Sequence, residues 1–282
     1  MDKPILVVIV NYFLADHIAA LLGSGALSTQ DVLLVDNASE PNRIEELAAH
    51  HSADVLLLDR NYGFAGAVNR AVASARPHDQ ILLLNPDVRL TASTVTKLRR
   101  TLAASDLTGL SPGVMNLDGS PQLVCGGPHT LWSFVTYFFF ISRVLPRARG
   151  ILYTPRQVAA VLQPEWLGMA CVLLRGDAFE RFGPIPEDEI VYGEDLVWGT
   201  TATRSGARFA VQNDLKVTHQ KGAAGGSAGS WGAMGRAARR ELGPLRGRLA
   251  AWTMWLGLRI RQLAGRKVVA DRQSATLRTP AR

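Results

Sequence analysis

The sequence predicts an α/β fold with a mostly parallel β-sheet flanked by helices. Four apolar runs, at residues 5–10, 31–35, 54–58 and 80–84, are expected to form short strands. They are continuous rather than alternating, which is typical of strands covered on both faces. Helical stretches lie between them, so strands and helices alternate along the chain. This alternation predicts parallel strands joined by crossover helices.

The remaining elements follow from local patterns. Helices are expected between the strands, and Thr91 or Ser93 can cap a fourth helix that runs to about Ala104. The first three helices are expected over residues 14–22, 41–50 and 64–76. Downstream we expect a hairpin over 109–124 with its turn at 116–120, an aromatic helix over 131–146, a strand over 166–175, helices over 177–182 and 194–206, and short strands at ARFAV (207–211) and LKVTH (215–219).

The composition is that of a folded protein in a reducing compartment. The chain has 282 residues, 47% hydrophobic and 20% charged, which suits one large domain or a domain with an appendage. Cys125 and Cys171 stand far apart without metal-like spacing, so each is expected to be a small buried residue. The N-terminal run ILVVIV is too short for a signal-peptide core, and we expect a cytoplasmic protein.

Positive charge is concentrated at the C-terminal end. From Arg236 onward there are twelve Lys or Arg and two acids, a net charge of +10, whereas the whole chain carries +7 and residues 1–235 carry −3. No nucleic-acid partner is expected, because such a domain would carry its charge on the folded body and no recognition signature is present. The expected organisation is a main domain (1–222), a Gly/Ala/Ser-rich linker (223–235) and a basic amphipathic helical region (236–282).

The basic region contains an apolar stripe at helical spacing, with arginines beside it. A basic helix with tryptophans suits the surface of an anionic membrane. The alternative is a helix packed on the main domain with solvated arginines. The aromatic segment 131–146 is too short to span a bilayer and is expected to be buried or interfacial. The stripe comprises Leu245, Leu249, Trp252, Leu256, Ile260 and Leu263.

Three polar residues lie just after apolar runs: Asn11, Asp36 and Asp87. Ligands of parallel sheets bind beyond the carboxyl ends of the strands, where these side chains should gather. Each acid has a structural alternative, because such residues often make turns. In the functional interpretation Asp36 accepts hydrogen bonds from a nucleotide. Asp87, on a chain stiffened by Pro86, is then an oxygen ligand for Mg²⁺ or Mn²⁺.

Two later segments carry the same ambiguity. Glu194 and Asp195 lie in the first turn of a predicted helix, where they either complement the helix dipole or supply a general base. His219 follows an apolar strand and is a structural residue unless it meets Asp87 in space. Glycines at the opening of the helix in segment 60–72 would let the backbone approach a phosphate.

Six segments with His219 downstream form an ordered set: VVIVNY (7–12), VDNAS (35–39), NYGFAGAVNRA (61–71), LLLNPDV (82–88), EWLGMACVLLR (165–175) and YGED (192–195). This set resembles glycosyltransferase family 2, which has the GT-A fold, and in particular its bacterial rhamnosyltransferase-like branch. The pair N-x-G-F-A-x-x-x-N and LNPD is quite specific to that branch. The resemblance covers about residues 5–222 and implies that 1–222 is a glycosyltransferase catalytic domain.

The resemblance implies roles for individual residues. Asp87 would bind a divalent cation, Mg²⁺ or Mn²⁺, with His219 as a second ligand. Asp195 resembles the catalytic base, with Glu194 beside it. The nucleotide pocket and the phosphate border would be formed by Asn11, Tyr12, Asp36, Asn37, Asn61, Gly63, Phe64, Asn69 and Asn85.

The chain also departs from the family pattern. It has WLGMA at 166–170, where the family usually has Trp-x-Ser-Gly-Ala. Met169 replaces a small residue, and we expect Trp166, Gly168 and Met169 to line the acceptor or sugar pocket. Two further departures are IPEDE at 185–189 and WGTT at 198–201.

These observations predict an inverting, metal-assisted glycosyltransferase that uses a dTDP- or UDP-linked sugar, with rhamnose or another hexose as the best guess. The expected acceptor is a hydroxyl of a glycan or polyprenyl-linked lipid in cell-envelope polysaccharide synthesis. The protein would then lie at the inner face of the plasma membrane. Two alternatives stay open: transfer to a soluble natural product, and a non-catalytic nucleotide-binding or membrane-scaffolding protein.

Overall fold

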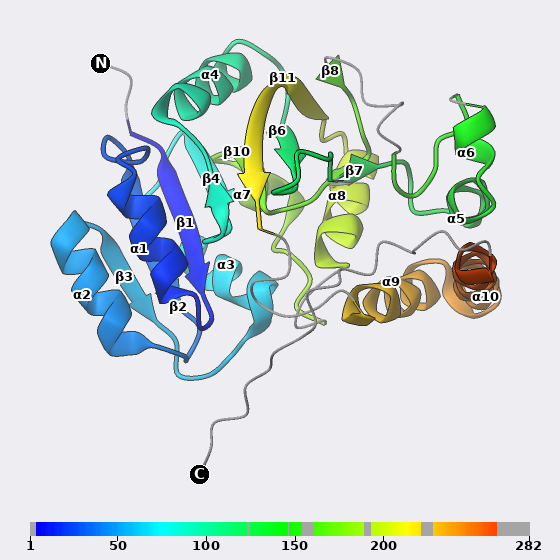
Figure 1. Ribbon diagram of the computed structural model, residues 1–282, viewed down its shortest axis with the longest axis horizontal. Helices are drawn as coiled ribbons and strands as arrows, with labels where there is room; N and C mark the ends of the chain where they lie inside the picture. Colours follow the sequence, from blue (N-terminus) through cyan, green and yellow to red (C-terminus); the bar gives the residue numbers. More distant parts are fainter. Residues whose placement is uncertain are drawn as a thin grey trace.

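A nine-stranded sheet forms the centre of the described part of the chain, with helices on both faces and a group of C-terminal helices at one side (Figure 1). The computed structural model describes residues 4–122, 125–145, 147–153, 161–188, 193–220 and 228–263. Along the sheet the strands are β3 (Asp54–Leu57), β2 (Asp31–Asp36), β1 (Leu6–Asn11), β4 (Gln80–Leu84), β10 (Cys171–Arg175), β6 (Gly109–Met115), β11 (Phe209–His219) and β5 (Val88–Arg89), and β8 (Val161–Leu162) also pairs with β11.

The sheet is mostly parallel, as the sequence predicts. β1, β2, β3 and β4 run parallel to one another, and β6 runs parallel to β11. Between these two groups, β10 is antiparallel to both β4 and β6. The carboxyl ends of β1, β2, β4 and β11 therefore meet at one edge of the sheet. A separate two-stranded sheet joins β7 (Cys125–Gly126) to β9 (Trp166–Leu167).

Both faces of the sheet are covered, which explains the continuous apolar runs. Alternate residues of a strand point to opposite faces, so Val7 and Ile9 of β1 join one core while Leu6 and Val8 join the other. The helices α1 (Ala15–Gly23), α2 (Pro41–His51) and α4 (Ala92–Ala103) cover the first face, and α3 (Gly63–Ser74), α7 (Ala178–Phe182) and α8 (Glu194–Arg204) cover the second.

Several elements differ from the expected ones. The two strands expected near residues 207–219 form the single strand β11, whose register shifts between Gln212 and Lys216. The aromatic segment is broken by the left-handed backbone of Phe140 (φ 63°) into α5 (Leu131–Phe138) and α6 (Ile141–Val144). Part of the expected linker over 223–235 is helical, because α9 spans Ala228–Glu241, whereas 221–227 lie outside the described residues.

The C-terminal helix α10 (Gly243–Leu263) packs against α5 and α9 through small residues. A Cβ atom at Gly257 would lie 2.5 Å from the Cβ of Phe138 and 2.8 Å from its carbonyl oxygen, so glycine permits this close approach. Ala250 and Met254 are buried in the same core. No described helix is both long and apolar enough to cross a membrane.

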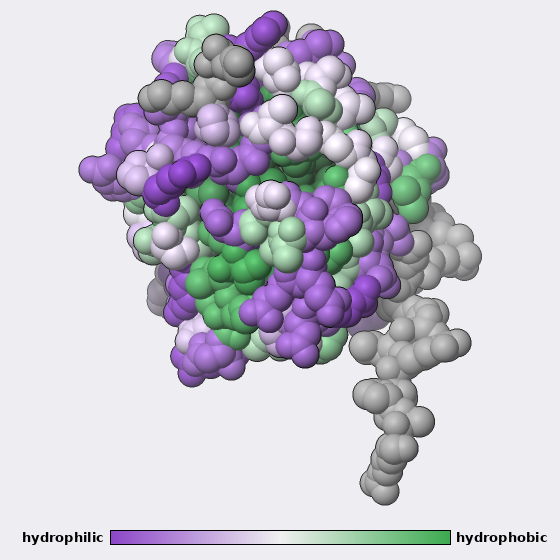
Figure 2. All heavy atoms as spheres, turned by 90° about the vertical axis from the view of Figure 1, so that its left-hand side faces the viewer, coloured by the Kyte–Doolittle hydropathy of each residue, from purple (hydrophilic) through white to green (hydrophobic). Residues whose placement is uncertain are grey.

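The opposite end of the sheet is open. β3 forms this edge, and its Leu57 is exposed. Figure 2 shows the molecule from the side that lies at the left of Figure 1, with hydrophobic side chains in hollows between hydrophilic ones. The described structure thus has exposed apolar side chains both near β3 and on the C-terminal helices.

Candidate active site

Asn11 and Asp36 end the neighbouring strands β1 and β2 and lie opposite each other in the register. Both are buried, and the Nδ2 of Asn11 donates to Oδ1 of Asp36 at 2.8 Å. Asp36 also accepts hydrogen bonds from Ser39 and from the backbone N–H of Glu40. The side chains therefore form a hydrogen-bonded turn that fixes the loops above both strands.

The contacts of Asp36 keep its carboxylate charged. Burial alone would raise the pKa of Asp36, but the backbone N–H groups of Ser39 and Glu40, with the side chain of Asn11, hold it below its usual value. The contacts of Asp36 are therefore explained by the structural alternative, in which it is a turn residue. Its expected hydrogen bond to a base or ribose remains a prediction.

Two exposed aromatic residues follow β1. Tyr12 is 39% exposed and Phe13 is 63% exposed, and their rings meet edge to face with centroids 4.9 Å apart. Phe13 has φ 58° and Ala38, in the adjacent loop, has φ 57°. Left-handed backbone is unusual for such residues and is often found at functional sites. Tyr12 was expected here from the sequence, whereas Phe13 was not, although the sequence places this aromatic residue shortly after the apolar run 5–10.

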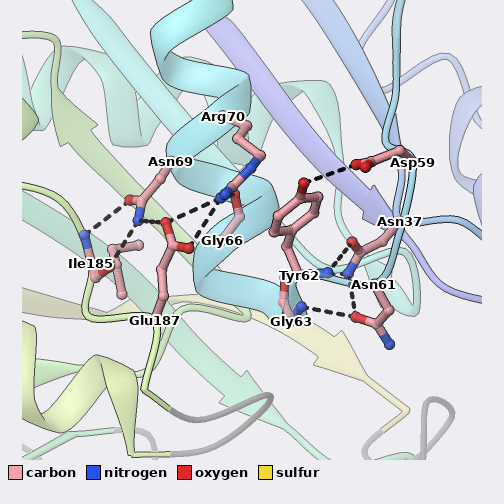
Figure 3. Close-up of polar contacts among 10 residues, drawn as sticks. All are labelled: Asn37, Asp59, Asn61, Tyr62, Gly63, Gly66, Asn69, Arg70, Ile185 and Glu187. Atoms are coloured by element: carbon pink, nitrogen blue, oxygen red, sulfur yellow. Dashed lines mark hydrogen bonds and ion pairs between the residues drawn. The ribbon is translucent and has the colours of Figure 1, made fainter.

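Asn37 ties the loop after β3 to the end of β2. Its Nδ2 donates to Oδ1 of Asn61 at 2.9 Å, and its Oδ1 accepts from the backbone N–H of Tyr62 at 2.9 Å (Figure 3). Asn61 Oδ1 also accepts from the N–H of Gly63 at 2.8 Å. In Figure 3 the amide nitrogen of Asn61 points away from these partners. The Oδ1 of Asn61 therefore fixes the side chain, and its Nδ2 is directed away from Asn37 and Gly63.

The helix α3 begins at Gly63, whose φ of 72° is readily adopted only by glycine. Phe64 is partly buried and packs against the second core. Asn69 does not face the strand ends: its amide bonds the backbone of Ile185, and its Nδ2 also donates to Glu187 (Figure 3). The structure thus uses Asn69 to hold another loop, and its expected contact with the donor phosphates stays a prediction.

The predicted metal-site residues come together at the same edge of the sheet. His219 Nε2 lies 3.2 Å from Oδ1 of Asp87 and 3.4 Å from Nδ2 of Asn85. Asp87 is 5% exposed and His219 9% exposed. β5 pairs with β11 here, so Val88 lies opposite His219 and brings the LNPD segment against the end of β11.

Gln122 orients His219 and was missed by sequence reasoning. Its Nε2 donates to the carbonyl oxygen of His219 at 2.8 Å, which fixes the amide orientation. Its Oε1 then faces Nδ1 of His219 at 2.9 Å and accepts the hydrogen from that nitrogen. In a neutral ring the Nε2 lone pair is consequently directed toward Asp87. No local pattern predicts this contact, because the two residues are 97 positions apart.

The chemistry of this pair fits a divalent cation. A lone pair on His219 Nε2 and a carboxylate oxygen of Asp87 face each other, an arrangement that needs either a proton or a cation. Among the described residues there is no cluster of three or more His, Cys, Asp or Glu side chains that could hold a metal ion. Two protein ligands suit a cation that takes its other ligands from substrate phosphates, as Mg²⁺ commonly does.

The acidic pair begins α8, as expected. Glu194 is buried, and Asp195 accepts a hydrogen bond from the backbone N–H of Leu196 at 2.8 Å. Burial raises the pKa of Asp195 to about 6, although backbone hydrogen bonds oppose the shift. A carboxylate with such a pKa is basic enough to accept a proton near neutral pH.

The residues expected in the sugar or acceptor pocket are mostly packed in the interior. Trp166 is 4% exposed, and its Nε1 donates to the carbonyl oxygen of Ile151 at 3.2 Å. Met169 is 6% exposed and lies in the second core. Gly168, between them, is half-buried. The structure assigns packing contacts to the first two side chains, and a pocket role for all three stays a prediction.

The fold is the GT-A fold, as comparisons with solved structures show. GalNAc-T7 with UDP, GalNAc and Mn²⁺ aligns with a TM-score of 0.58 at 14% identity over 77% of this chain, which spans 43% of that chain. S. aureus TarS 1-349 aligns with a TM-score of 0.57 at 17% identity, over 94% of this chain and 75% of that one. TarS 1-349 in complex with UDP-GlcNAc aligns with a TM-score of 0.56 at 18% identity, over 92% and 72%.

One family model matches the N-terminal part of the chain. Residues 6–122, less than half of the chain, match the family described as glycosyl transferase family 2, and with the structural neighbours this match supports a family 2 glycosyltransferase. No curated protein sequence matches the chain. The matched range contains the strand-end residues Asn11, Asp36 and Asp87 together with Gln122.

Proposed function

We propose that the chain transfers a sugar from a nucleoside diphosphate donor, linked to UDP or dTDP, to an acceptor hydroxyl with inversion at the anomeric carbon. The observation that carries the proposal is the cluster of Asn85, Asp87 and His219, at the same sheet edge as the fixed loops above Asn11 and Asp36. Strand ends of this kind are where α/β folds bind nucleotides. The structures of TarS with UDP-GlcNAc and of GalNAc-T7 with UDP support this donor class.

Asp195 is the proposed general base. The acceptor oxygen attacks the anomeric carbon, the bond from that carbon to the diphosphate oxygen breaks, and the nucleoside diphosphate leaves with the bonding electrons. Asp195 takes the proton of the acceptor hydroxyl. Because this carboxyl has a pKa of about 6, turnover should rise with pH through that value, as the carboxylate form is the active one.

Asp87 and His219 are the side chains that would hold Mg²⁺ or Mn²⁺. Bound there, the cation would offset negative charge on the leaving diphosphate. Gln122 keeps the Nδ1–H tautomer of His219, so that its Nε2 is available as a ligand. The side chain of Asn85 lies beside this pair and is proposed to contact the donor.

A panel of nucleotide sugars tests the donor class. Thermal unfolding is measured with each sugar in the presence and absence of Mn²⁺, because a ligand that binds only the folded state stabilises it by RT ln(1 + [L]/Kd) and so raises the unfolding midpoint. We expect a UDP- or dTDP-linked hexose, with rhamnose as the first candidate, to stabilise the protein more with Mn²⁺ than without it. Equal stabilisation by every nucleotide, with or without Mn²⁺, would contradict the proposal.

The acceptor is proposed to be a glycan or polyprenyl-linked lipid of the cell envelope, reached at the inner face of the plasma membrane. Large apolar side chains are exposed mainly on α5–α6 and α10, which hold nine of the thirteen found in the described residues. Arginines lie between those on α10, and Arg259 stacks on Trp255 at 5.5 Å. Tryptophan, leucine and arginine on one exposed helix favour a membrane interface. The nine are Trp132, Phe139, Val144, Leu145, Leu245, Leu249, Trp252, Trp255 and Ile260.

Flotation with anionic vesicles tests this surface. The double variant Trp252→Ser, Trp255→Ser should float less than the unchanged protein, because both side chains are more than half exposed. The matched control is Leu117→Ser, which removes an exposed apolar side chain from the turn after β6. Equal flotation of all three proteins would contradict docking through α10.

Two other functions make different predictions. A transferase acting on a soluble natural product should turn over a small aglycone without lipid. A non-catalytic nucleotide-binding or scaffolding protein should bind the donor and show no turnover with any acceptor. The cluster of Asn85, Asp87 and His219 and the basic carboxyl of Asp195 favour the enzyme.

A further inference from the structure

The loop that precedes the catalytic helix departs from the family pattern, and the structure shows what these residues contact. Residues 183–188 connect α7 to the segment that leads to α8. Asn69 of α3 bonds Ile185 twice: its Nδ2 donates to the carbonyl oxygen at 2.8 Å, and its Oδ1 accepts from the backbone N–H at 2.9 Å (Figure 3). A side-chain amide that satisfies both backbone groups of one residue fixes the loop against α3.

A charged contact strengthens the same attachment. Glu187 accepts hydrogen bonds from Asn69 at 3.0 Å and from Arg70 at 3.1 Å. The guanidinium of Arg70 lies over the ring of Tyr62, 3.6 Å from its centroid, and Tyr62 is in turn bonded to Asn37 at the end of β2. Figure 3 shows two sets of hydrogen bonds, one around Glu187 and one around Asn37, and the ring contact of Arg70 with Tyr62 links them.

Gly66 makes this arrangement possible. A Cβ atom there would lie 2.8 Å from the Cβ of Tyr62, 3.1 Å from Oε2 of Glu187 and 3.2 Å from Nη1 of Arg70. Arg70 also donates to the carbonyl oxygen of Gly66 at 2.9 Å. The three side chains thus converge over a residue that has no side chain of its own.

The other side of the loop is attached to the helix that carries the proposed base. Trp198 of α8 donates from Nε1 to the carbonyl oxygen of Gly183 at 3.0 Å. Asp188 pairs with Arg240 of α9 at 3.3 Å. Loop 183–188 therefore contacts the donor side of the fold through α3 and the base side through α8.

From these contacts we infer that Asn69, Arg70 and Glu187 are positioning residues, which set the placement of Asp195 relative to the donor by fixing loop 183–188 on α3. The inference rests on the proposed function, because it takes Asp195 as the base. Small displacements of a reacting group are costly: about 1 Å can lower a rate by about a hundredfold. Among the departing residues, the side chains of Glu187, Asp188 and Trp198 make these attachments.

The test compares Glu187→Ala and Arg70→Ala with the conservative variant Glu187→Gln, in the full chain. We expect kcat to fall about tenfold in the two alanine variants, with the donor Kd, measured by titration calorimetry, changed less than about twofold. Glu187→Gln keeps an oxygen that accepts from both partners and should retain most of the turnover. Amide exchange in α8 should become faster in the alanine variants. Asp16→Ala, which breaks an exposed ion pair with Arg43, is the matched control.

The outcomes separate this inference from the proposed function. Unchanged kcat in both alanine variants, with Asp195→Asn inactive, would overturn the positioning inference and leave the base intact. Turnover by Asp195→Asn close to that of the unchanged protein would overturn the proposed function itself. A fall in kcat matched by an equal loss of donor binding or of thermal stability would also contradict positioning, because it would show a general structural effect.

Discussion

In the sheet region, aliphatic side chains of β1 and β2 alternate between two cores and are covered by helices on both faces, whereas α10 packs on α5 and α9 through small residues and leaves its tryptophans exposed. Polar groups are buried and paired in the sheet region and exposed on α10. At the strand ends, Asn11 and Asp36 satisfy each other inside the protein. On α10 the arginines lie in solvent between exposed leucines. The first region thus holds its polar groups in fixed geometry, whereas the second leaves large apolar side chains at the surface.

Packing through small residues makes the C-terminal layer sensitive to added volume. Gly257→Leu should lower the free energy of unfolding by about 3 kcal/mol, because the new side chain meets the backbone of Phe138. Urea unfolding measures the change. Gly23→Leu is the matched control, since a Cβ atom there has no neighbour within 4 Å. An equal loss of unfolding free energy in Gly257→Leu and Gly23→Leu would contradict the close packing of α10 on α5.

His129 makes the C-terminal layer sensitive to acid. It is 1% exposed, and burial, with the charges of Arg204 and Arg240, lowers its pKa to about 4. The folded state therefore binds fewer protons than the unfolded state between about pH 6.5 and 4, so stability falls as the pH drops through that window. The loss from pH 7 to pH 4.5 should be roughly 2–3 kcal/mol.

Unfolding at both pH values measures this contribution. His129→Gln should reduce the difference in unfolding free energy between pH 7 and pH 4.5, whereas the exposed His50→Gln serves as the control. If His129→Gln leaves the full acid sensitivity in place, the buried imidazole is not its source.

Metal affinity at the sheet edge should depend on Gln122, which orients His219 but is not itself a proposed ligand. Gln122→Leu removes both hydrogen bonds to His219 and should weaken Mn²⁺ binding in the presence of UDP about tenfold, or about 1.4 kcal/mol. Calorimetric titration of Mn²⁺ into the protein with UDP measures the affinity. Gln30→Leu, a half-buried glutamine at the other end of the sheet, is the control. Unchanged Mn²⁺ affinity in Gln122→Leu would contradict the orienting role.

The local parts of the fold could be predicted from the sequence. The first four strands, and the placement of Asn11, Asp36 and Asp87 at their ends, follow from apolar runs that stop at polar residues. The contacts that join distant segments could not. Asn69 and Glu187 are 118 positions apart, and Gln122 and His219 are 97 apart, so no periodicity links them.

In the C-terminal region, too, the local pattern could be predicted from the sequence, whereas the tertiary contacts could not. The stripe of Leu245, Leu249 and Trp252 was correctly predicted as one helical face, because helical spacing is a local property. Which face would be buried depended on α5 and α9, whose close approach at Gly257 is a tertiary contact. The family resemblance supplied the candidate site residues, whereas the contacts of Glu187 and Asp188 became known only from the structure.

The central proposal is that the chain uses Asp195 as a general base toward a bound nucleotide sugar. The most direct test measures turnover and donor affinity of Asp195→Asn side by side. We predict that turnover falls about a thousandfold while the donor Kd stays within about twofold, because the asparagine keeps the shape but cannot take the proton. Turnover within about threefold of the unchanged protein would contradict the account.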